Sequence, residues 1–343
     1  MTTAIDVEGL TKRYGDVLAL DDLDLEIQEG EIFGFLGPNG AGKSTTIDVL
    51  LDFVRPTAGR ATVLGMDAQN RSRAVRRRVG VLPDAYHVYD RLTGRQHVQF
   101  AIDSKDSDDE AQALLERVGI EGAADRKAGG YSAGMRQRLV LAMSLVGQPD
   151  LLVLDEPTSG LDPSGARDVR HIIREERDRG ATVFFSSHVL SQVEAVCDRV
   201  GILHEGRLVA LDTIEGLRES VAAEARLTVR VDDLTDQAVD AVEALEGVSS
   251  VVVEDRQLSI TCDDGAKTDV IVALEANGAS VRDFETAETS LEELFVQYTT
   301  EAEGEAAAAE AIAPVEEAAA GTEDAAGTDE DPSEGAPVTG VDR

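Results

Sequence analysis

One segment of the chain has the residue types and the spacing that suit a bound phosphate. The segment "GPNGAGKST" matches the pattern G-x-x-x-x-G-K-[ST]. Its glycines let main-chain N–H groups converge on phosphate oxygens, Lys43 can reach the β- and γ-phosphates, and the Ser44 hydroxyl can ligate Mg²⁺. The nucleotide contacts that we predict in this loop are Gly37, Asn39, Gly40, Gly42, Lys43, Ser44 and Thr45.

Further polar side chains follow two short apolar runs that read as buried strands. "LLVLDEP" places Asp155 and Glu156 at the carboxyl end of one run, the edge at which open α/β sheets bind ligands. We predict that Asp155 holds Mg²⁺ through water and that Glu156 activates a water at the γ-phosphate. In "FFSSHVL", His188 follows the second run and can hydrogen-bond the γ-phosphate; a structural histidine is the alternative.

A second candidate anion site lies far along the chain, in "YSAGMRQR". Ser132 occupies the capping position of a predicted amphipathic helix and Gly134 lies just inside it. A helix start with small residues can hold an anion. One nucleotide should not need two phosphate cradles from distant parts of the same chain, so this second site needs an explanation.

The elements that must position these residues form an α/β pattern over residues 1–219, which predicts a largely parallel sheet. The strand "EIFGFLG" runs directly into the phosphate loop, and the helix "KSTTIDVLLDFV" follows. "RVGILHEGRLVALD" predicts a hairpin that turns at Glu205–Gly206. Residues from about 86 to 148 are mostly helical, which predicts a helical subdomain inserted into the sheet domain.

The rest of the chain predicts a small accessory α+β domain at 220–300 and a tail at 301–343. Residues 225–284 follow the order β-α-β-β-α-β of the ferredoxin-like arrangement, and "TSLEELFVQYT" predicts a short closing helix. The tail has no aromatic residue and carries thirteen Asp or Glu against one Arg. Such a segment buries too little apolar area to offset its ordering entropy, so we expect it to be disordered.

The phosphate loop, "YSAGM", "LDEPTSGLDP" and "SSHVL" occur in this order. Over residues 1–219 the chain thereby resembles the ATP-binding subunit of an ATP-binding-cassette (ABC) transporter. The resemblance implies a P-loop NTPase fold, ATP and Mg²⁺ as cofactors, and ATP hydrolysis helped by Lys43. It also implies that Tyr14 stacks on adenine, that Asp84 lies near Mg²⁺ where the family usually has Gln, and that Asp162 faces a partner subunit.

The same resemblance explains the second anion site. In this family two cassettes face each other head to tail, so Ser132 and Gly134 of one chain would cap the ATP held by the other. The implied partners are a second copy or a paralogue and a separate integral membrane permease, which would place the chain at the cytoplasmic face of the membrane. "YSAGM" and "SLEELF" resemble export-type cassettes for drugs, lipids or polysaccharides. The accessory domain would regulate, support the dimer or sense a ligand.

Composition narrows the class of function. The net charge is −35, with 67 Asp and Glu against 32 Lys and Arg, and only five of the basic residues are lysine. Nucleic-acid binding by phosphate neutralisation needs the opposite balance. An acidic surface low in lysine fits a protein from a halophile with high internal salt, and an ordinary acidic protein with an acidic tail is the alternative. No apolar run approaches the roughly 18 residues of a spanning helix, and two cysteines favour a reducing cytoplasm.

Two other classes of function stay open at this point. A soluble ABC-type ATPase could act on ribosomes or nucleic acid, but such proteins usually carry two cassettes or a long coiled-coil insertion. A regulatory module could hold ATP without hydrolysing it, which the presence of Glu156 and His188 disfavours. We therefore expect an ATPase subunit whose conformational change is transmitted to a permease.

Overall fold

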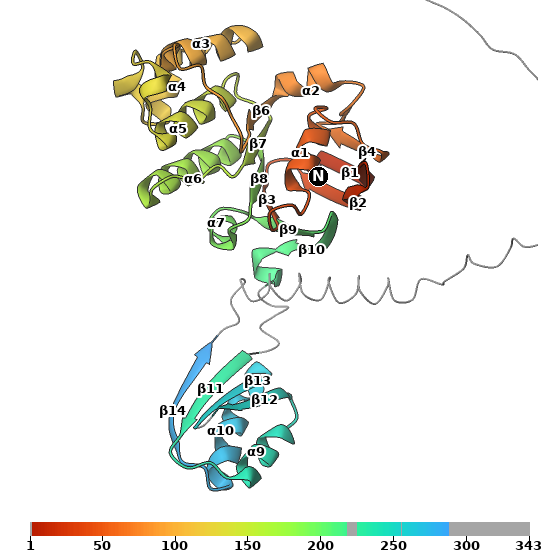
Figure 1. The fold of residues 1–343 in the computed structure, drawn as a ribbon, viewed down its shortest axis with the longest axis vertical. Coiled ribbons are helices and arrows are strands. Elements are labelled where there is room, and N and C mark those ends of the chain that lie inside the picture. The colour runs from red at the N-terminus through yellow and green to blue at the C-terminus, as the bar shows by residue number, and fades with distance from the viewer. Residues whose placement is uncertain (1, 218–224, 255, 288–343) are drawn as a thin grey trace, which may run out of the picture. The chain divides into compact units, whose positions relative to one another are not determined.

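The computed structural model describes residues 2–217, 225–254 and 256–287 (Figure 1). The predicted domain boundary near 219, the helix predicted in "TSLEELFVQYT" and the acidic tail lie outside these residues.

A six-stranded sheet with the order β10-β9-β3-β8-β7-β6 forms the centre of the N-terminal part. The strands from β9 to β6 are parallel and β10 pairs antiparallel at the edge. Every residue of β3, β7 and β8 is buried, as the continuous apolar runs predict for strands covered on both faces. The strands are β3 (Ile32–Leu36), β6 (Val79–Leu82), β7 (Leu151–Asp155), β8 (Thr182–Ser187), β9 (Arg199–His204) and β10 (Arg207–Thr213).

The predicted hairpin between β9 and β10 is confirmed. His204 pairs with Arg207 across a two-residue turn. Both turn residues have positive φ, 46° at Glu205 and 83° at Gly206. Two positive φ values are the backbone requirement of the tight turns that match the twist of paired strands.

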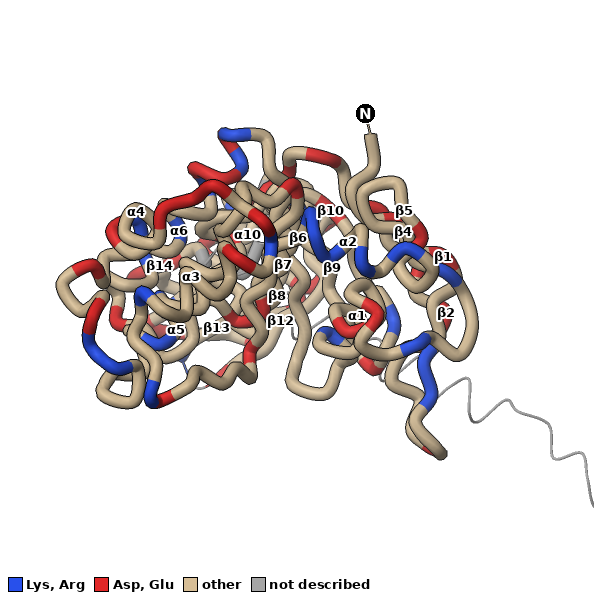
Figure 2. The backbone as a smooth tube through the Cα atoms, turned by 90° about the horizontal axis from the view of Figure 1, so that it is seen from above, with Lys and Arg blue, Asp and Glu red and all other residues tan. Residues whose placement is uncertain are grey.

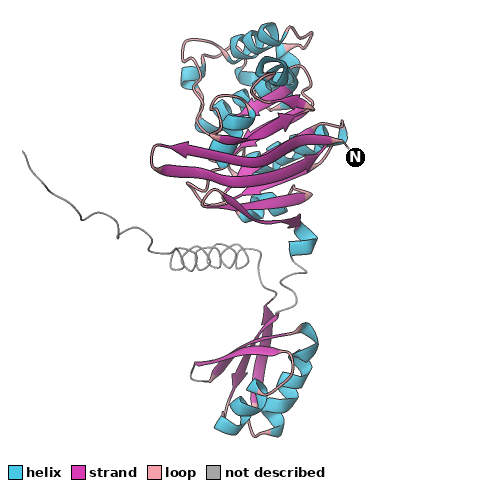
Figure 3. Cartoon of the chain, turned by 90° about the vertical axis from the view of Figure 1, so that its right-hand side faces the viewer, coloured by secondary structure: helices cyan, strands magenta, loops and turns pink. Residues whose placement is uncertain are grey.

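A second sheet, with the order β2-β1-β4-β5, is antiparallel and was not anticipated by the sequence analysis (Figure 3). In β2 the buried positions alternate with exposed acids, as in "LDLEI", where Leu23, Leu25 and Ile27 are buried. Such alternation is typical of a strand with one solvated face. The six-stranded sheet confirms the prediction of a largely parallel sheet, and this antiparallel sheet lies beside that prediction. The strands are β1 (Thr3–Tyr14), β2 (Val17–Gln28), β4 (Ala58–Val63) and β5 (Met66–Asp67).

The segment between β6 and β7 is helical, and Figure 1 shows its helices grouped on one side of the central sheet. It contains α3 (Gly94–Lys105), α4 (Ala111–Arg117) and α5 (Ala133–Ser144), with short 3-10 turns between α4 and α5. A capping box of Thr93 and Gln96 starts α3. The other helices of the N-terminal part are α1 (Lys43–Leu50), α2 (Ser72–Arg78), α6 (Pro163–Asp178) and α7 (Leu190–Glu194).

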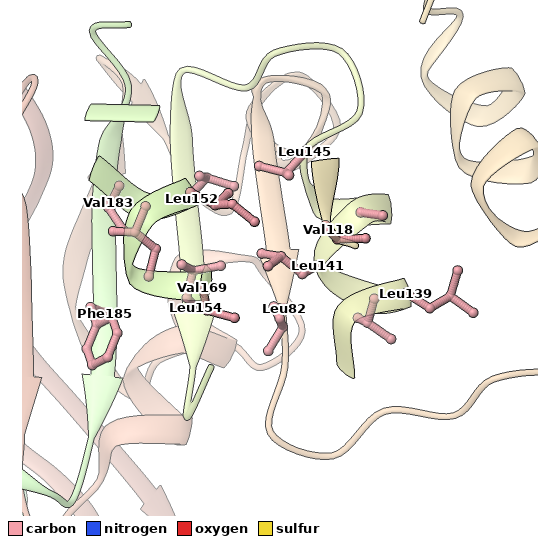
Figure 4. Packing of buried hydrophobic residues seen from close by; sticks show 14 of the residues in the cluster. Leu82, Val118, Leu139, Leu141, Leu145, Leu152, Leu154, Val169, Val183 and Phe185 are labelled. Carbon is pink, nitrogen blue, oxygen red and sulfur yellow. The ribbon is translucent and has the colours of Figure 1, made fainter. Parts of the chain in front are cut away.

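One apolar cluster joins the helical segment to the central sheet (Figure 4). Leu141 and Leu145 of α5 belong to it, together with Leu82 of β6 and Leu152 of β7, and all four are at most 2% exposed. Burying a leucine side chain contributes roughly 2 kcal/mol, so this packing fixes α5 against the two strands.

The C-terminal described part has its own core and the predicted β-α-β-β-α-β order, which the structure confirms. Its sheet has the order β12-β13-β11-β14, and every pair is antiparallel. Among the described residues of the whole chain, no helix combines the length and the apolar character needed to cross a bilayer. The elements are β11 (Ala225–Val231), α9 (Asp236–Glu243), β12 (Val248–Glu254), β13 (Gln257–Cys262), α10 (Lys267–Ala276) and β14 (Val281–Ala287).

Acidic positions occur both around β1 and β4 and around α3 and α4, so the excess of negative charge is spread over the surface (Figure 2). One acid is buried instead. Glu176 of α6 is 2% exposed and accepts hydrogen bonds from Arg117 of α4 at 2.5 Å and from Arg179 at 2.5 Å. This ion network ties the helical segment to α6.

We predict that Arg117→Met lowers the free energy of unfolding by about 2 kcal/mol, because it leaves the buried Glu176 carboxylate with only one cation. The matched control is Arg60→Met, which breaks the exposed pair of Arg60 and Glu8 and should change nothing measurable. Urea unfolding of the full chain measures both. Equal effects of the two substitutions would contradict this account of Glu176.

Candidate functional site

The phosphate loop connects β3 to α1, and its shape requires glycine. Gly42 has a φ of 111°, and a Cβ atom there would lie 2.6 Å from the Ala19 carbonyl oxygen. A Cβ atom at Gly37 would lie 2.4 Å from the Leu203 carbonyl oxygen. The loop is thus pressed against the main chain of β2 and β9. Because α1 has no side-chain cap, the N–H groups of its first turn are available to an anion.

Lys43 lies inside this loop and is 7% exposed. Its Nζ donates to the carbonyl oxygens of Gly37 at 2.6 Å and Pro38 at 3.1 Å. Burial lowers the pKa of Lys43, and the negative charges of nearby carboxylates act in the opposite direction. The ammonium group is therefore bound by main-chain carbonyls of the phosphate loop in this structure.

Asp155 ends β7 at the carboxyl edge of the sheet, next to the phosphate loop. The Ser44 hydroxyl donates to its Oδ2 at 3.3 Å. Burial raises the pKa of Asp155, and the negative charge of Asp84 raises it further. A buried carboxylate of this kind gains from a nearby cation, which is what the predicted role in Mg²⁺ binding requires.

These residues border one open cleft with about 530 Å³ of empty volume. Tyr14, Gly37, Ser132, Gly134 and His188 are not among its lining residues. Ala19 of β2 is a lining residue that sequence reasoning missed, since a small apolar residue gives no chemical signal. The lining residues are Ala19, Asn39, Gly40, Gly42, Lys43, Ser44, Thr45, Asp84, Asp155 and Glu156.

Glu156 and His188, the predicted general base and its companion, are in direct contact. Nδ1 of His188 lies 2.6 Å from Oε1 of Glu156, and the His188 main-chain N–H donates to the same oxygen at 2.8 Å. Ser187 Oγ donates to Oε2 at 3.3 Å, a contact that the sequence analysis did not foresee. His188 is therefore linked to the cleft by its contact with Glu156, and it is close enough to orient the Glu156 carboxylate.

Tyr14 lies at the end of β1 and is 44% exposed. Lys12 Nζ lies 4.7 Å from the centre of its ring, in a cation–π contact. The stacking of Tyr14 on adenine stays a prediction.

Ser132 caps α5, and its Oγ accepts a hydrogen bond from the Met135 N–H at 3.2 Å. The predicted helix start is therefore present. Figure 1 shows β7 and β8 between α5 and α1. Ser132 and Gly134 are not among the residues that line the cleft at the phosphate loop, so the two candidate anion sites do not form one pocket within the chain. Asp162 likewise caps a helix, α6, and accepts from the Gly165 N–H at 2.9 Å.

The cleft fits a magnesium ion that arrives with a nucleotide better than a resident metal. Among the described residues, no group of three or more His, Cys, Asp or Glu side chains is arranged to hold a metal ion. The Ser44 hydroxyl and the Asp155 carboxylate are oxygen ligands, which Mg²⁺ prefers, and Mg²⁺ commonly adds phosphate oxygens and water to one or two carboxylates. Asp84 lines the same cleft.

Comparison with known proteins places this site in a family. Residues 20–159 match the ABC transporter family, and residues 213–299 match the C-terminal domain of DrrA1-3-like ATP-binding proteins. The chain is 36% identical over 308 residues to the daunorubicin resistance ATP-binding protein DrrA3 of Streptomyces coeruleorubidus, covering 87% of this chain and 96% of the relative. The chain belongs to the ABC transporter family. It is an ATP-binding subunit of the DrrA type, and it hydrolyses ATP as this ATPase family does.

Other relatives of this ABC ATPase agree. It is 40% identical over 215 residues to the bacitracin transport ATP-binding protein BcrA of Bacillus licheniformis, covering 61% of this chain and 69% of the relative. A solved ATP-binding subunit of an ABC transporter covers 64% of this chain and 93% of its own, at 28% identity and a TM-score of 0.59. A dimeric cassette solved after hydrolysis with ADP and phosphate has a TM-score of 0.57 over 61% and 98%, at 22% identity. These relatives favour the ATPase of a transporter over an ATPase that acts on ribosomes or nucleic acid.

We predict that Lys43→Ala reduces ATP turnover about a hundredfold or more, because the cleft loses the cation aimed at the phosphates. The matched control is Lys105→Ala. Lys105 also binds two main-chain carbonyls, and burial also lowers its pKa, but it does not line the cleft. Phosphate release measures both variants. Similar losses in the two variants would mean that Lys43 acts only through packing.

Proposed function

We propose that this ATPase drives an exporter in which two cassettes close over ATP and a separate membrane permease carries the substrate. One observation carries the proposal. The cleft of one chain is lined by the phosphate loop and by Glu156, which His188 contacts, whereas Ser132, at the second helix start, caps α5 and does not line that cleft. The site becomes complete when a second chain supplies its own Ser132.

The proposed dimer is head to tail, and its partner is a second copy or a close paralogue. Ser132 and Gly134 of one chain would cap the γ-phosphate held by the phosphate loop of the other. Ser132 is exposed and is not among the residues that line the cleft of its own chain, which supports this arrangement. The similar cassette solved as a dimer with ADP and phosphate also supports it.

The chain's own residues divide the work of hydrolysis. Lys43 would neutralise charge on the β- and γ-phosphates, and Glu156 would orient a water and accept its proton. His188 would hold Glu156 in place and donate to the γ-phosphate. Mg²⁺ would be held by Ser44, Asp155 and Asp84, and when bound it would offset part of the negative charge of the phosphates. Tyr14 would stack on adenine.

The proposed organisation follows the sequence. Residues 1–219 would form the cassette, with a helical subdomain at about 86–148. Residues 220–300 would form an accessory domain that regulates or supports the dimer, and the acidic segment 301–343 would serve solvation. The cassette would bind the cytoplasmic side of a permease and so be peripheral to the membrane. The exported substrate would be a drug-like compound, because relatives are named for daunorubicin resistance and bacitracin transport.

We predict that Glu156→Gln forms a stable dimer in ATP and Mg²⁺, because ATP in the interface is no longer hydrolysed. Light scattering should give twice the chain mass of 36.5 kDa with ATP and the single mass without it. Ser132→Asp in the Glu156→Gln background keeps the helix cap but sets a negative charge against the γ-phosphate, so this variant should stay monomeric. Ser132→Asn is the uncharged control of similar size and should still dimerise. Monomers of Glu156→Gln alone would overturn the proposed dimer.

We also propose that the protein works at high salt. Its net charge of −35 is self-repelling, and the Debye length falls from about 10 Å at 0.1 M salt to about 3 Å at 1 M. The thermal midpoint of unfolding should therefore rise by about 10 °C or more between 0.1 M and 2 M KCl. A midpoint that is high at 0.1 M and does not change with KCl would indicate an ordinary acidic protein.

A further inference from the structure

The helix that carries the proposed lid is joined by a hydrogen bond to the general base of its own chain. Gln137 lies on α5, about one and a half turns beyond Ser132, and is 5% exposed. Its Nε2 donates to the main-chain carbonyl oxygen of Glu156 at 3.1 Å. Gln137 itself does not line the cleft, whereas Glu156 does.

The main chain of Glu156 has a conformation that depends on its surroundings. Its φ is 49°, which is uncommon for a residue with a side chain, and Pro157 restricts it further. Such a conformation persists where neighbouring groups hold it. Glu156 N–H donates to the Ser186 carbonyl at 3.0 Å, and its own carbonyl accepts from Ser159 N–H at 3.1 Å. Of the groups bonded to this main chain, Gln137 is the one that comes from the helical segment.

The carboxylate of Glu156 is held at both of its oxygens in this structure. Both donors from His188 reach Oε1, and Ser187 Oγ reaches Oε2. These bonds, together with the main chain from which the side chain extends, set the direction in which the carboxylate meets an attacking water. A small rotation of the Glu156 main chain would turn it, because the side chain is only 8% exposed and has little room of its own.

We propose that Gln137 is a positioning residue through which a movement of α5 changes the orientation of Glu156. The proposal rests on the proposed head-to-tail dimer. When Ser132 caps the nucleotide of the partner, α5 is drawn toward it, and the bond from Gln137 reorients Glu156 in the same chain. The strength of apolar packing between α5 and the sheet does not depend on orientation, whereas the strength of a hydrogen bond depends on its distance and angle. ATP capped at one site would thereby prepare the base at the other.

The test compares Gln137→Met with the wild-type full chain. Methionine has a similar size and no donor, so we expect kcat for ATP hydrolysis to fall about tenfold, with KM and nucleotide affinity within about twofold. The matched control is Ser144→Ala on the same helix, which removes a buried bond to the Leu141 carbonyl and should keep the wild-type kcat. Equal losses in kcat for the two variants, or a wild-type kcat for Gln137→Met, would overturn the proposal.

A second variant tests the donor itself. In Gln137→Glu, the side chain can donate to the Glu156 carbonyl only when it is protonated. Its kcat relative to wild type should therefore be higher at pH 6 than at pH 8, and a ratio that is the same at both pH values would overturn the proposal. Failure of the proposed dimer would appear separately, as the absence of an ATP-dependent dimer in Glu156→Gln with Gln137 intact.

Discussion

The charge balance of the cleft is the constraint on which the rest depends. Three carboxylates, those of Asp84, Asp155 and Glu156, face one cation, Lys43, among the described residues that line it. A nucleotide triphosphate adds further negative charge to this group. A single chain therefore lacks part of the positive charge that would balance the phosphates, although its phosphate loop and the uncapped start of α1 offer N–H donors. We attribute the missing part to Mg²⁺ and to the helix start of a second chain, since both bring positive potential without a further basic side chain.

The fold serves this constraint by holding the groups at one edge. Parallel strands deliver Asp155 and the Ser187–His188 pair to the carboxyl edge of the sheet, where the phosphate loop leaves β3. Gly37 and Gly42 of that loop are required because the main chain of β9 and β2 lies where a Cβ atom would be. The helical segment then adds α5, whose packing against β6 and β7 makes its position depend on the sheet, and whose Gln137 touches Glu156.

Much of this arrangement could be predicted from the sequence, because it is local. The phosphate loop, the acids at the end of β7 and the alternation in residues 225–284 each depend on neighbouring residues. The antiparallel sheet of β1, β2, β4 and β5 was missed although the alternation in β2 was readable. The contacts of Gln137 and Ser187 with Glu156 could not have been found, since a hydrogen bond between segments far apart in the chain leaves no periodic signal.

The account depends most on the claim that one chain does not hold a complete catalytic site. The direct measurement is the rate of ATP hydrolysis per chain as the protein is diluted in saturating ATP and Mg²⁺. A site shared between two chains predicts that the rate per chain falls steeply once the concentration drops below the dissociation constant of the dimer. A rate per chain that stays constant down to the lowest measurable concentration, where light scattering detects only monomers, would contradict it.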